Sequence, residues 1–379
     1  MNSTTKTFQL LAHALRVDSG GDSNDEFAAA IESGDVDWDC LVKLADEERM
    51  TAALAAALSR RGLLKSLPKA VQGAFRRRMF MATEVNARIK RQAEQAVGIL
   101  NDAGITPMLL KGSLHLFEAD ADELCERRMA DLDVIVPVDK LNDSIQALRD
   151  AGYIPDKEDE GWTYQYRPMY HPDHIIGLEL HIRPGEQRNF LGVEEAWQKA
   201  VPVDAPGLKI VALEPGHRIA HNIFHSEVQD RGYTLGLVCL RQLYDLAKIC
   251  TRFEGKIDWQ EILDRMERNN MGPLFRARMH LAVKLLGATP PTIAVSDARS
   301  SRYLKRCLAQ LRWEHLMNGA RWFAGMFGPV NRYHLDLLYS CGTSGLNMHM
   351  HRAKHIWKIF WRHRDHLGDR ISMHGRNLQ

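Results

Sequence analysis

A change of periodicity near residue 105 limits the fold of this chain more than any other feature. From residue 7 to residue 104 the apolar residues recur at helical spacing, and Gly104 ends the last of these patterns. Strand-like runs follow at residues 105–110 (ITPMLL), 131–137 (DLDVIVP) and 175–184 (IIGLELHIRP), with an amphipathic helix expected over residues 138–152. This order predicts a small sheet with helices packed against it.

Helical patterns return after about Leu213 and continue toward the C-terminus, with Gly and Pro between them. At 379 residues, the chain is long enough for two or three domains. We expect an α+β protein in three parts: an N-terminal helical region over residues 1–90, a core with a small mixed sheet over residues 91–210, and a C-terminal helical domain over residues 211–379.

Composition excludes several classes of protein. The net charge of +2 gives no global attraction toward nucleic acid or a membrane, so an anionic partner must be bound by local charge. The six cysteines form no CxxC pair and indicate reduced thiols. No apolar run approaches the ~18–20 residues of a membrane helix, and the N-terminus lacks a signal-peptide pattern. We therefore expect a cytoplasmic protein without a membrane partner.

Asp131 and Asp133 lie one residue apart at the start of the second strand-like run. Side chains alternate along a strand, so both carboxylates face the same side, where each raises the pKa of the other unless a cation compensates. Mg²⁺ or Mn²⁺ is the natural compensation for such oxygen ligands. An isolated pair of this kind is otherwise explained by a turn residue and a solvated edge residue.

Two further features accompany the aspartates. Lys111, Gly112 and Ser113 follow the first strand-like run and begin an expected helix, where backbone N–H groups favour phosphate. Gly112 allows close approach to the backbone, and Ser113 adds a hydroxyl. Glu179, in the third run, supplies a third acid from a neighbouring strand. Together these features predict a metal site beside a phosphate-binding turn.

This combination resembles the nucleotidyltransferase superfamily with the DNA-polymerase-β-like fold. The sequence is most similar to an uncharacterised bacterial nucleotidyltransferase family with an LLKG strand, an R-x-M-x-D-x-D motif and a later LHxR-like strand. Here these are Leu109 to Gly112, Arg127 or Arg128 to Asp133, and Leu180 to Arg183. The helical segments at residues 36–50 and 240–249 also resemble that family, so the likeness covers roughly residues 35–290. Ala130 stands where the family often has Gly.

The resemblance implies an enzyme that moves an NMP group from an NTP to a hydroxyl- or phosphate-bearing acceptor by a two-metal mechanism. It implies that Gly112 and Ser113 hold nucleotide phosphates, and that Asp131 and Asp133 bind Mg²⁺ or Mn²⁺. Glu179 would be the third carboxylate, which aligns or deprotonates the acceptor. A small-molecule acceptor is favoured over a tRNA end or a protein, because the charge gives no strong nucleic-acid signature.

Several nearby residues have two interpretations. Lys111 either contacts a phosphate or projects to solvent, and Arg127 and Arg128 either bind the triphosphate or lie in a solvated loop. His181 shares the face of Glu179 and either contacts a substrate or Glu179, or is a buried, satisfied histidine. Arg183, on the same face, adds positive charge. The nucleotide-binding prediction comprises Lys111, Gly112, Ser113, Arg128 and His181.

Two more patterns remain open. His217, His221 and His225 form a helical stripe that fits zinc binding, a substrate contact or helix packing, although no HExxH motif is present. Asp245 is expected to contact the base or a structural arginine. The basic, aromatic segment at residues 351–370 fits RNA binding, a membrane surface or, preferably, packing on preceding helices. A non-catalytic nucleotide-binding module is the rival to an enzyme.

Overall fold

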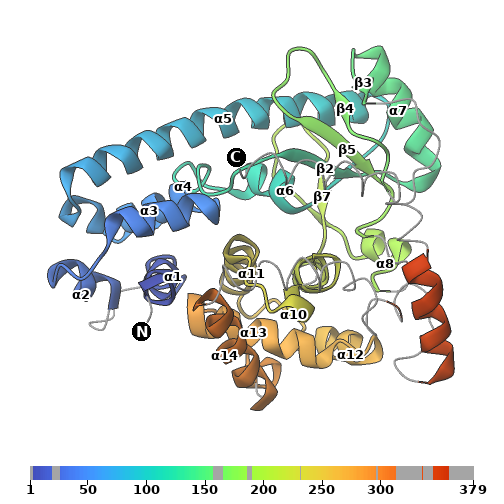
Figure 1. Ribbon diagram of the computed structural model, residues 1–379. Coiled ribbons are helices and arrows are strands. Elements are labelled where there is room, and N and C mark those ends of the chain that lie inside the picture. The colour runs from blue at the N-terminus through green and yellow to red at the C-terminus, as the bar shows by residue number, and fades with distance from the viewer. Residues whose placement is uncertain are drawn as a thin grey trace, which may run out of the picture.

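The protein is an α+β fold in which helices surround a mixed sheet (Figure 1). The computed structural model describes residues 3–18, 26–156, 165–185, 190–230, 232–295, 298–312, 335 and 345–357. The predicted fold class is confirmed. Within these residues, no helix is both long and apolar enough to span a membrane.

The three strand-like runs of the sequence lie side by side at the centre of the sheet. The strand order is β3-β4-β5-β2-β1-β7-β6. Its strands are β1 (Met108–Leu109), β2 (Asp131–Ile135), β3 (Ile154–Pro155), β4 (Met169–Tyr170), β5 (Gly177–His181), β6 (Val201–Pro202) and β7 (Val211–Ala212). β2 pairs with β5 in parallel and with β1 antiparallel. This parallel register places Asp133 directly beside Glu179.

The helices before the sheet lead into one long helix that reaches it. They are α1 (Ser3–Ala14), α2 (Glu26–Glu32), α3 (Trp38–Glu47), α4 (Thr51–Arg60), the 3-10 turn η1 (Leu63–Ser66) and α5 (Lys69–Asp102). α5 runs from the N-terminal helices across to the sheet (Figure 1). Phe75 joins the core of the N-terminal helices, whereas Ile89 and Leu100 join the core of the sheet. The predicted boundary at residue 90 therefore falls inside α5.

The remaining helices flank the sheet and follow it. Those within the core region are α6 (Lys111–Glu118), η2 (Val138–Lys140), α7 (Leu141–Asp150) and α8 (Val193–Gln198). Later come α9 (Pro215–Phe224), the π-helical turn η3 (His225–Gln229), α10 (Gly232–Leu235), α11 (Leu240–Arg252), α12 (Trp259–Arg268), α13 (Gly272–Leu286), η4 (Thr292–Ala294), α14 (Ala298–Arg312) and a helix over residues 346–357.

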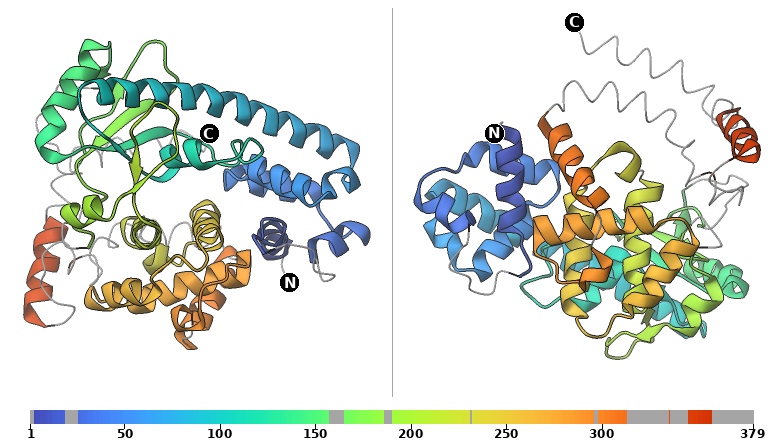
Figure 2. Two further views of the ribbon diagram at one scale, coloured as in Figure 1. Left: turned by 180° about the vertical axis from the view of Figure 1, so that it is seen from behind. Right: turned by 90° about the horizontal axis from the view of Figure 1, so that it is seen from below.

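The N-terminal and C-terminal helices share a single apolar core. Phe8 and Leu11 of α1 belong to the same buried cluster as Phe275 and Leu281 of α13, and Figure 2 shows the two sets of helices packed together. Burial of such side chains contributes roughly 1.5–3 kcal/mol each. The sheet and the C-terminal half of α5 form a second cluster. The sheet is thus held against a helical body built from both ends of the chain.

Candidate active site

Two carboxylates and an imidazole converge on the face shared by β2 and β5. Asp133, Glu179 and His181 each offer a ligand atom, and these atoms all lie within 4.8 Å of one another. His181 Nε2 lies 3.1 Å from Asp133 Oδ1 and 3.7 Å from Glu179 Oε2. Gln165 donates a hydrogen bond to Glu179. We call Asp133, Glu179 and His181 the strand-edge cluster.

The first turn of α6 holds the strand-edge cluster in place. Lys111 has a positive φ of 46°, a conformation that is uncommon for a non-glycine residue and costs energy. Its Nζ lies 3.0 Å from Asp133 Oδ1. Ser113 is fully buried, and its hydroxyl accepts a 2.7 Å hydrogen bond from the Asp133 backbone N–H. Ser113 thus lies where it positions β2, and its hydroxyl is not exposed to a substrate.

The carboxylates of the site differ in charge balance. Burial raises the pKa of Asp133, but the hydrogen bond from His181 and the charge of Lys111 outweigh it and hold that pKa well below its usual range. Burial and the charge of Asp133 raise the pKa of both Asp131 and Glu179. Negative charge at this strand edge is therefore only partly compensated by the protein.

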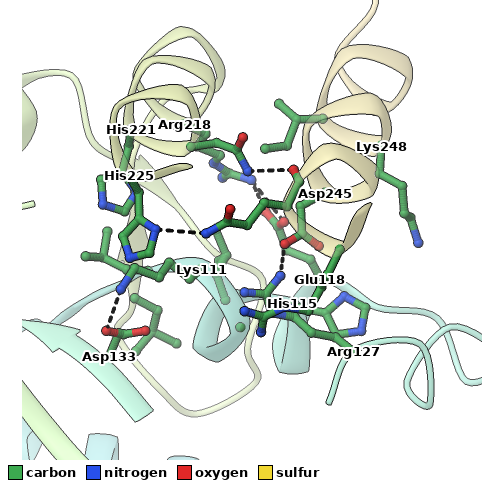
Figure 3. Close-up of a pocket in the computed structure, with 18 of the residues that line it drawn as sticks. Lys111, His115, Glu118, Arg127, Asp133, Arg218, His221, His225, Asp245 and Lys248 are labelled. Carbon is green, nitrogen blue, oxygen red and sulfur yellow. Dashed lines mark hydrogen bonds and ion pairs between the residues drawn. The ribbon is translucent and has the colours of Figure 1, made fainter. Parts of the chain in front are cut away.

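A cavity of about 320 Å³ begins at the aspartates and extends between α6 and the helices α9 and α11 (Figure 3). Asp131 and Asp133 both line it, although Asp131 is not part of the strand-edge cluster. The basic residues that line it are Arg49, Lys111, Arg127, Arg128, Arg218, Arg241, Lys248 and Arg252. Its acids are Glu118, Asp131, Asp133 and Asp245. This excess of cations suits a polyanionic ligand.

Arg127 connects the turn at residues 111–113 to α11. Its guanidinium forms an ion pair with Asp245, which is the contact with a structural arginine that the sequence suggested. A Cβ at Gly112 would lie 2.7 Å from Arg127 Nε and 2.6 Å from Met129 Sδ. A side chain at this position would therefore displace the side chains of Arg127 and Met129, which pack on the turn. Burial, together with the charge of Arg241, lowers the pKa of Arg127 to about 10.

Arg49 and Arg241 were not singled out from the sequence. Glu48 accepts a 3.1 Å hydrogen bond from the backbone N–H of Leu240, the first residue of α11. This contact brings the turn after α3 to the start of α11 and places both arginines at the cavity. Neither they nor Arg128 form an ion pair within the described part of the chain.

The histidine stripe of α9 and η3 divides between two environments. His221 and His225 line the cavity. Burial and the charge of Lys111 lower the pKa of His221 to about 3, so that His221 is neutral, and His225 contacts Asp230 and Gln242. His217 is fully buried, and its Nε2 lies 3.3 Å from Glu195 Oε1.

Two sequence patterns lie apart from the strand-edge cluster. Arg183 is buried and donates a hydrogen bond to the Gly185 carbonyl. Of the basic aromatic segment, Ile356 and Trp357 are 40% and 62% exposed, whereas Phe360 and Trp361 fall outside the described residues. The packing of this segment stays a prediction.

The donor set of the strand-edge cluster can hold a divalent metal. Carboxylate oxygens are the ligands that Mg²⁺ and Mn²⁺ prefer, and the raised pKa values of Asp131 and Glu179 indicate negative charge that a cation would balance. A model of uncharacterised nucleotidyltransferases matches residues 34–287, which include the whole site. None of the curated proteins matches the chain. By the extent of the family match, the chain belongs to the family of uncharacterised nucleotidyltransferases.

Proposed function

We propose that the protein is a Mg²⁺- or Mn²⁺-dependent nucleotidyltransferase that moves an NMP group from an NTP to the hydroxyl of a small molecule. The observation that carries the proposal is the pairing of Asp133 with Glu179 across parallel strands, with His181 beside them, where Asp133 also lines the basic cavity. Family membership supports nucleotidyl transfer in general. The enzyme would act in the cytoplasm, where NTPs are made.

In this proposal Asp131, Asp133 and Glu179 hold the metal ions, and His181 supports Asp133. Bound divalent ions would neutralise charge on the triphosphate and lower the pKa of the attacking hydroxyl. The acceptor oxygen attacks the α-phosphorus, and the bond from that phosphorus to the β-phosphate oxygen breaks. Pyrophosphate leaves, and the hydroxyl proton goes to a carboxylate.

The basic residues of the cavity would bind the nucleotide. Lys111, Gly112 and Arg128 lie next to the aspartates along the cavity wall, where they can contact the phosphates. Arg127 and Arg241 are close enough for their positive charges to interact, near the start of α11. Ser113 would act indirectly, because its buried hydroxyl holds the backbone of Asp133.

Transfer to an RNA end is the second candidate. It is favoured by exposed basic residues along α5, namely Arg76, Arg77, Arg78, Arg88 and Arg91. Exposed arginines can contact a phosphate backbone, although Arg78 already pairs with Asp46. The two candidates share the nucleotide chemistry and differ only in the acceptor.

The test is label transfer from each of the four NTPs with Mg²⁺ or Mn²⁺, in the presence of a cell extract. We expect a labelled product with at least one NTP, and its loss in Asp133→Ala. Circular dichroism and the melting temperature show whether this variant is folded. A wild-type protein that binds an NTP but never transfers label would instead be a non-catalytic nucleotide-binding module.

A further inference from the structure

A second cavity, of about 290 Å³, borders the same aspartates. It shares Lys111, Asp131, Asp133 and His225 with the first cavity. Its other lining residues are Gln165, Glu179, His181, Pro184 and Gln229. Two molecules, one in each cavity, can therefore meet at Asp131 and Asp133. A transfer between two substrates needs this arrangement.

The two cavities differ in charge. Seven arginine and lysine residues line the first cavity in addition to Lys111. Among the described residues that line the second, Lys111 is the only arginine or lysine, and its ammonium contacts Asp133. The positive charge of the first cavity therefore complements a triphosphate, and the second cavity remains for the acceptor.

The wall of the second cavity beyond the proposed metal ligands is polar and carries little charge. Gln165 and Gln229 contribute amides, and His225 contributes an imidazole that already contacts Gln242 and Asp230. Amides both donate and accept hydrogen bonds, as hydroxyl groups do. A phosphate on the acceptor would find no arginine there among the described residues.

We propose that the second cavity binds the acceptor, and that the acceptor is an uncharged, hydroxyl-rich small molecule. The inference rests on the proposed function and decides between its two acceptor classes. The cavity volume lies just below the range of about 300–1,000 Å³ for small-molecule sites, so the acceptor must be small. One acceptor hydroxyl forms the new bond to the α-phosphorus, pyrophosphate departs, and the hydroxyl proton passes to a carboxylate of the site. Glu179 lines only this cavity.

The test separates the acceptor by charge. An extract of the cells that produce the protein is divided by ion exchange into uncharged, cationic and anionic small molecules, and RNA is kept as a fourth fraction. The full-length protein is incubated with each fraction, Mg²⁺ and each labelled NTP. We expect label to move only in the uncharged fraction. Transfer to the anionic, cationic or RNA fraction overturns the inference and leaves the proposed function standing.

Equilibrium dialysis with the NTPs separates the remaining outcomes. NTP binding without transfer in any fraction overturns both the acceptor inference and the catalytic proposal, and leaves a nucleotide-binding module. Failure to bind any NTP overturns the proposed function at its first step.

A matched pair of variants tests which cavity holds which substrate. Gln229 lines only the second cavity. Gln229→Arg should therefore raise the acceptor KM by about tenfold, which is the effect of losing one hydrogen bond. The NTP Kd should stay unchanged. Arg241 lines only the first, so Arg241→Gln should weaken NTP binding and leave the acceptor KM unchanged. Gln229→Ala shows whether loss of the amide alone has an effect. The reverse pattern would overturn the assignment.

Discussion

Two clusters in this protein have nearly the same ligand groups and different charge balance. The strand-edge cluster contains Asp133, Glu179 and His181. A second cluster contains Glu195, His217 and Glu261, and its ligand atoms also lie within 4.8 Å of one another. We call it the α9–α12 cluster, because His217 lies on α9 and Glu261 on α12. On distance alone, both clusters are candidate metal sites.

The two clusters differ because an arginine of the protein pairs with both carboxylates of the α9–α12 cluster. Arg265 donates hydrogen bonds to Glu195 and Glu261 in the α9–α12 cluster. Burial raises the pKa of Glu195, but the bonds from Arg265 and Lys199 outweigh it and lower that pKa to about 2. In the strand-edge cluster the pKa of Glu179 is raised instead. Convergent carboxylates therefore indicate a metal site only where no arginine already balances them.

The largest expected effect comes from removing Arg265. Arg265→Ala leaves Glu261 without its cation and Glu195 with Lys199 alone, and we expect the free energy of unfolding to fall by about 3 kcal/mol. The vacated cluster then has two carboxylates and an imidazole, a set that binds Zn²⁺. Urea unfolding with and without Zn²⁺ measures both effects. Zn²⁺ should restore stability in the variant and leave the wild type unchanged, and a variant that ignores Zn²⁺ would break the comparison.

The second-largest expected effect is a difference in Mn²⁺ affinity between the two clusters. Asp133→Asn should weaken Mn²⁺ binding by at least 10–100-fold, since changing even an outer-shell partner of a metal has an effect of that size. Glu195→Gln is the matched control and should leave Mn²⁺ binding unchanged, because Arg265 already pairs with that carboxylate. Electron paramagnetic resonance titration of free Mn²⁺ gives both affinities. Equal losses in the two variants would contradict the distinction.

A smaller effect is expected at Lys111, the cation of the strand-edge cluster. Lys111 contacts only Asp133 there, and a metal must displace this contact to reach the carboxylate oxygen. Lys111→Met should therefore strengthen Mn²⁺ binding in the absence of nucleotide, on the order of tenfold, which corresponds to one pKa unit of charge interaction. Arg128→Met is the control, because Arg128 lines the cavity without an ion pair among the described residues. Weaker binding in Lys111→Met would show that Lys111 supports the metal site.

The central sheet and the strand-edge acids could be predicted from sequence because their signals are local. β2 and β5 lie in runs of alternating or apolar residues, and the motif around Asp131 and Asp133 carries the family resemblance. The two-residue strands β3, β4, β6 and β7 are too short to show a period of two. The helical pattern from about residue 69 to residue 100 continues across the expected boundary at residue 90, and α5 spans Lys69–Asp102.

The parts of the site that sequence could not predict depend on contacts between distant segments. Arg49 and Arg241 reach one cavity because Glu48 accepts a hydrogen bond from the N-terminus of α11, a contact between residues 192 positions apart. The burial of Ser113 depends on how α6 packs on β2. The position of Glu179 beside Asp133 was expected from strand logic, but the parallel register that produces it is visible only in the fold.

The smallest expected effects are changes in stability of opposite sign when one glutamate of each cluster is neutralised. Glu195→Gln should lower the free energy of unfolding at pH 7 by roughly 0.5–1 kcal/mol, because a third of the side chain is exposed and solvent screens the pair. Glu179→Gln should raise stability in EDTA, because it removes a charge that Asp133 repels.

The pH dependence follows from the same pKa shifts. Since the folded pKa of Glu195 lies below its ordinary value of 4.5, its contribution is fully present above pH 4.5 and is lost as the pH falls toward 2. Glu179 has a raised folded pKa, so its unfavourable contribution grows as the pH rises above the ordinary value of 4.5 and is complete once the pH exceeds the folded pKa. Urea unfolding over about four pH units, from about pH 3 to about pH 7, measures how the free energy of unfolding changes with pH in each variant. Glu195→Gln should flatten the acid limb, and Glu179→Gln should gain stability toward neutral pH. Stability changes of the same sign in both variants would mean that the two clusters are electrostatically alike.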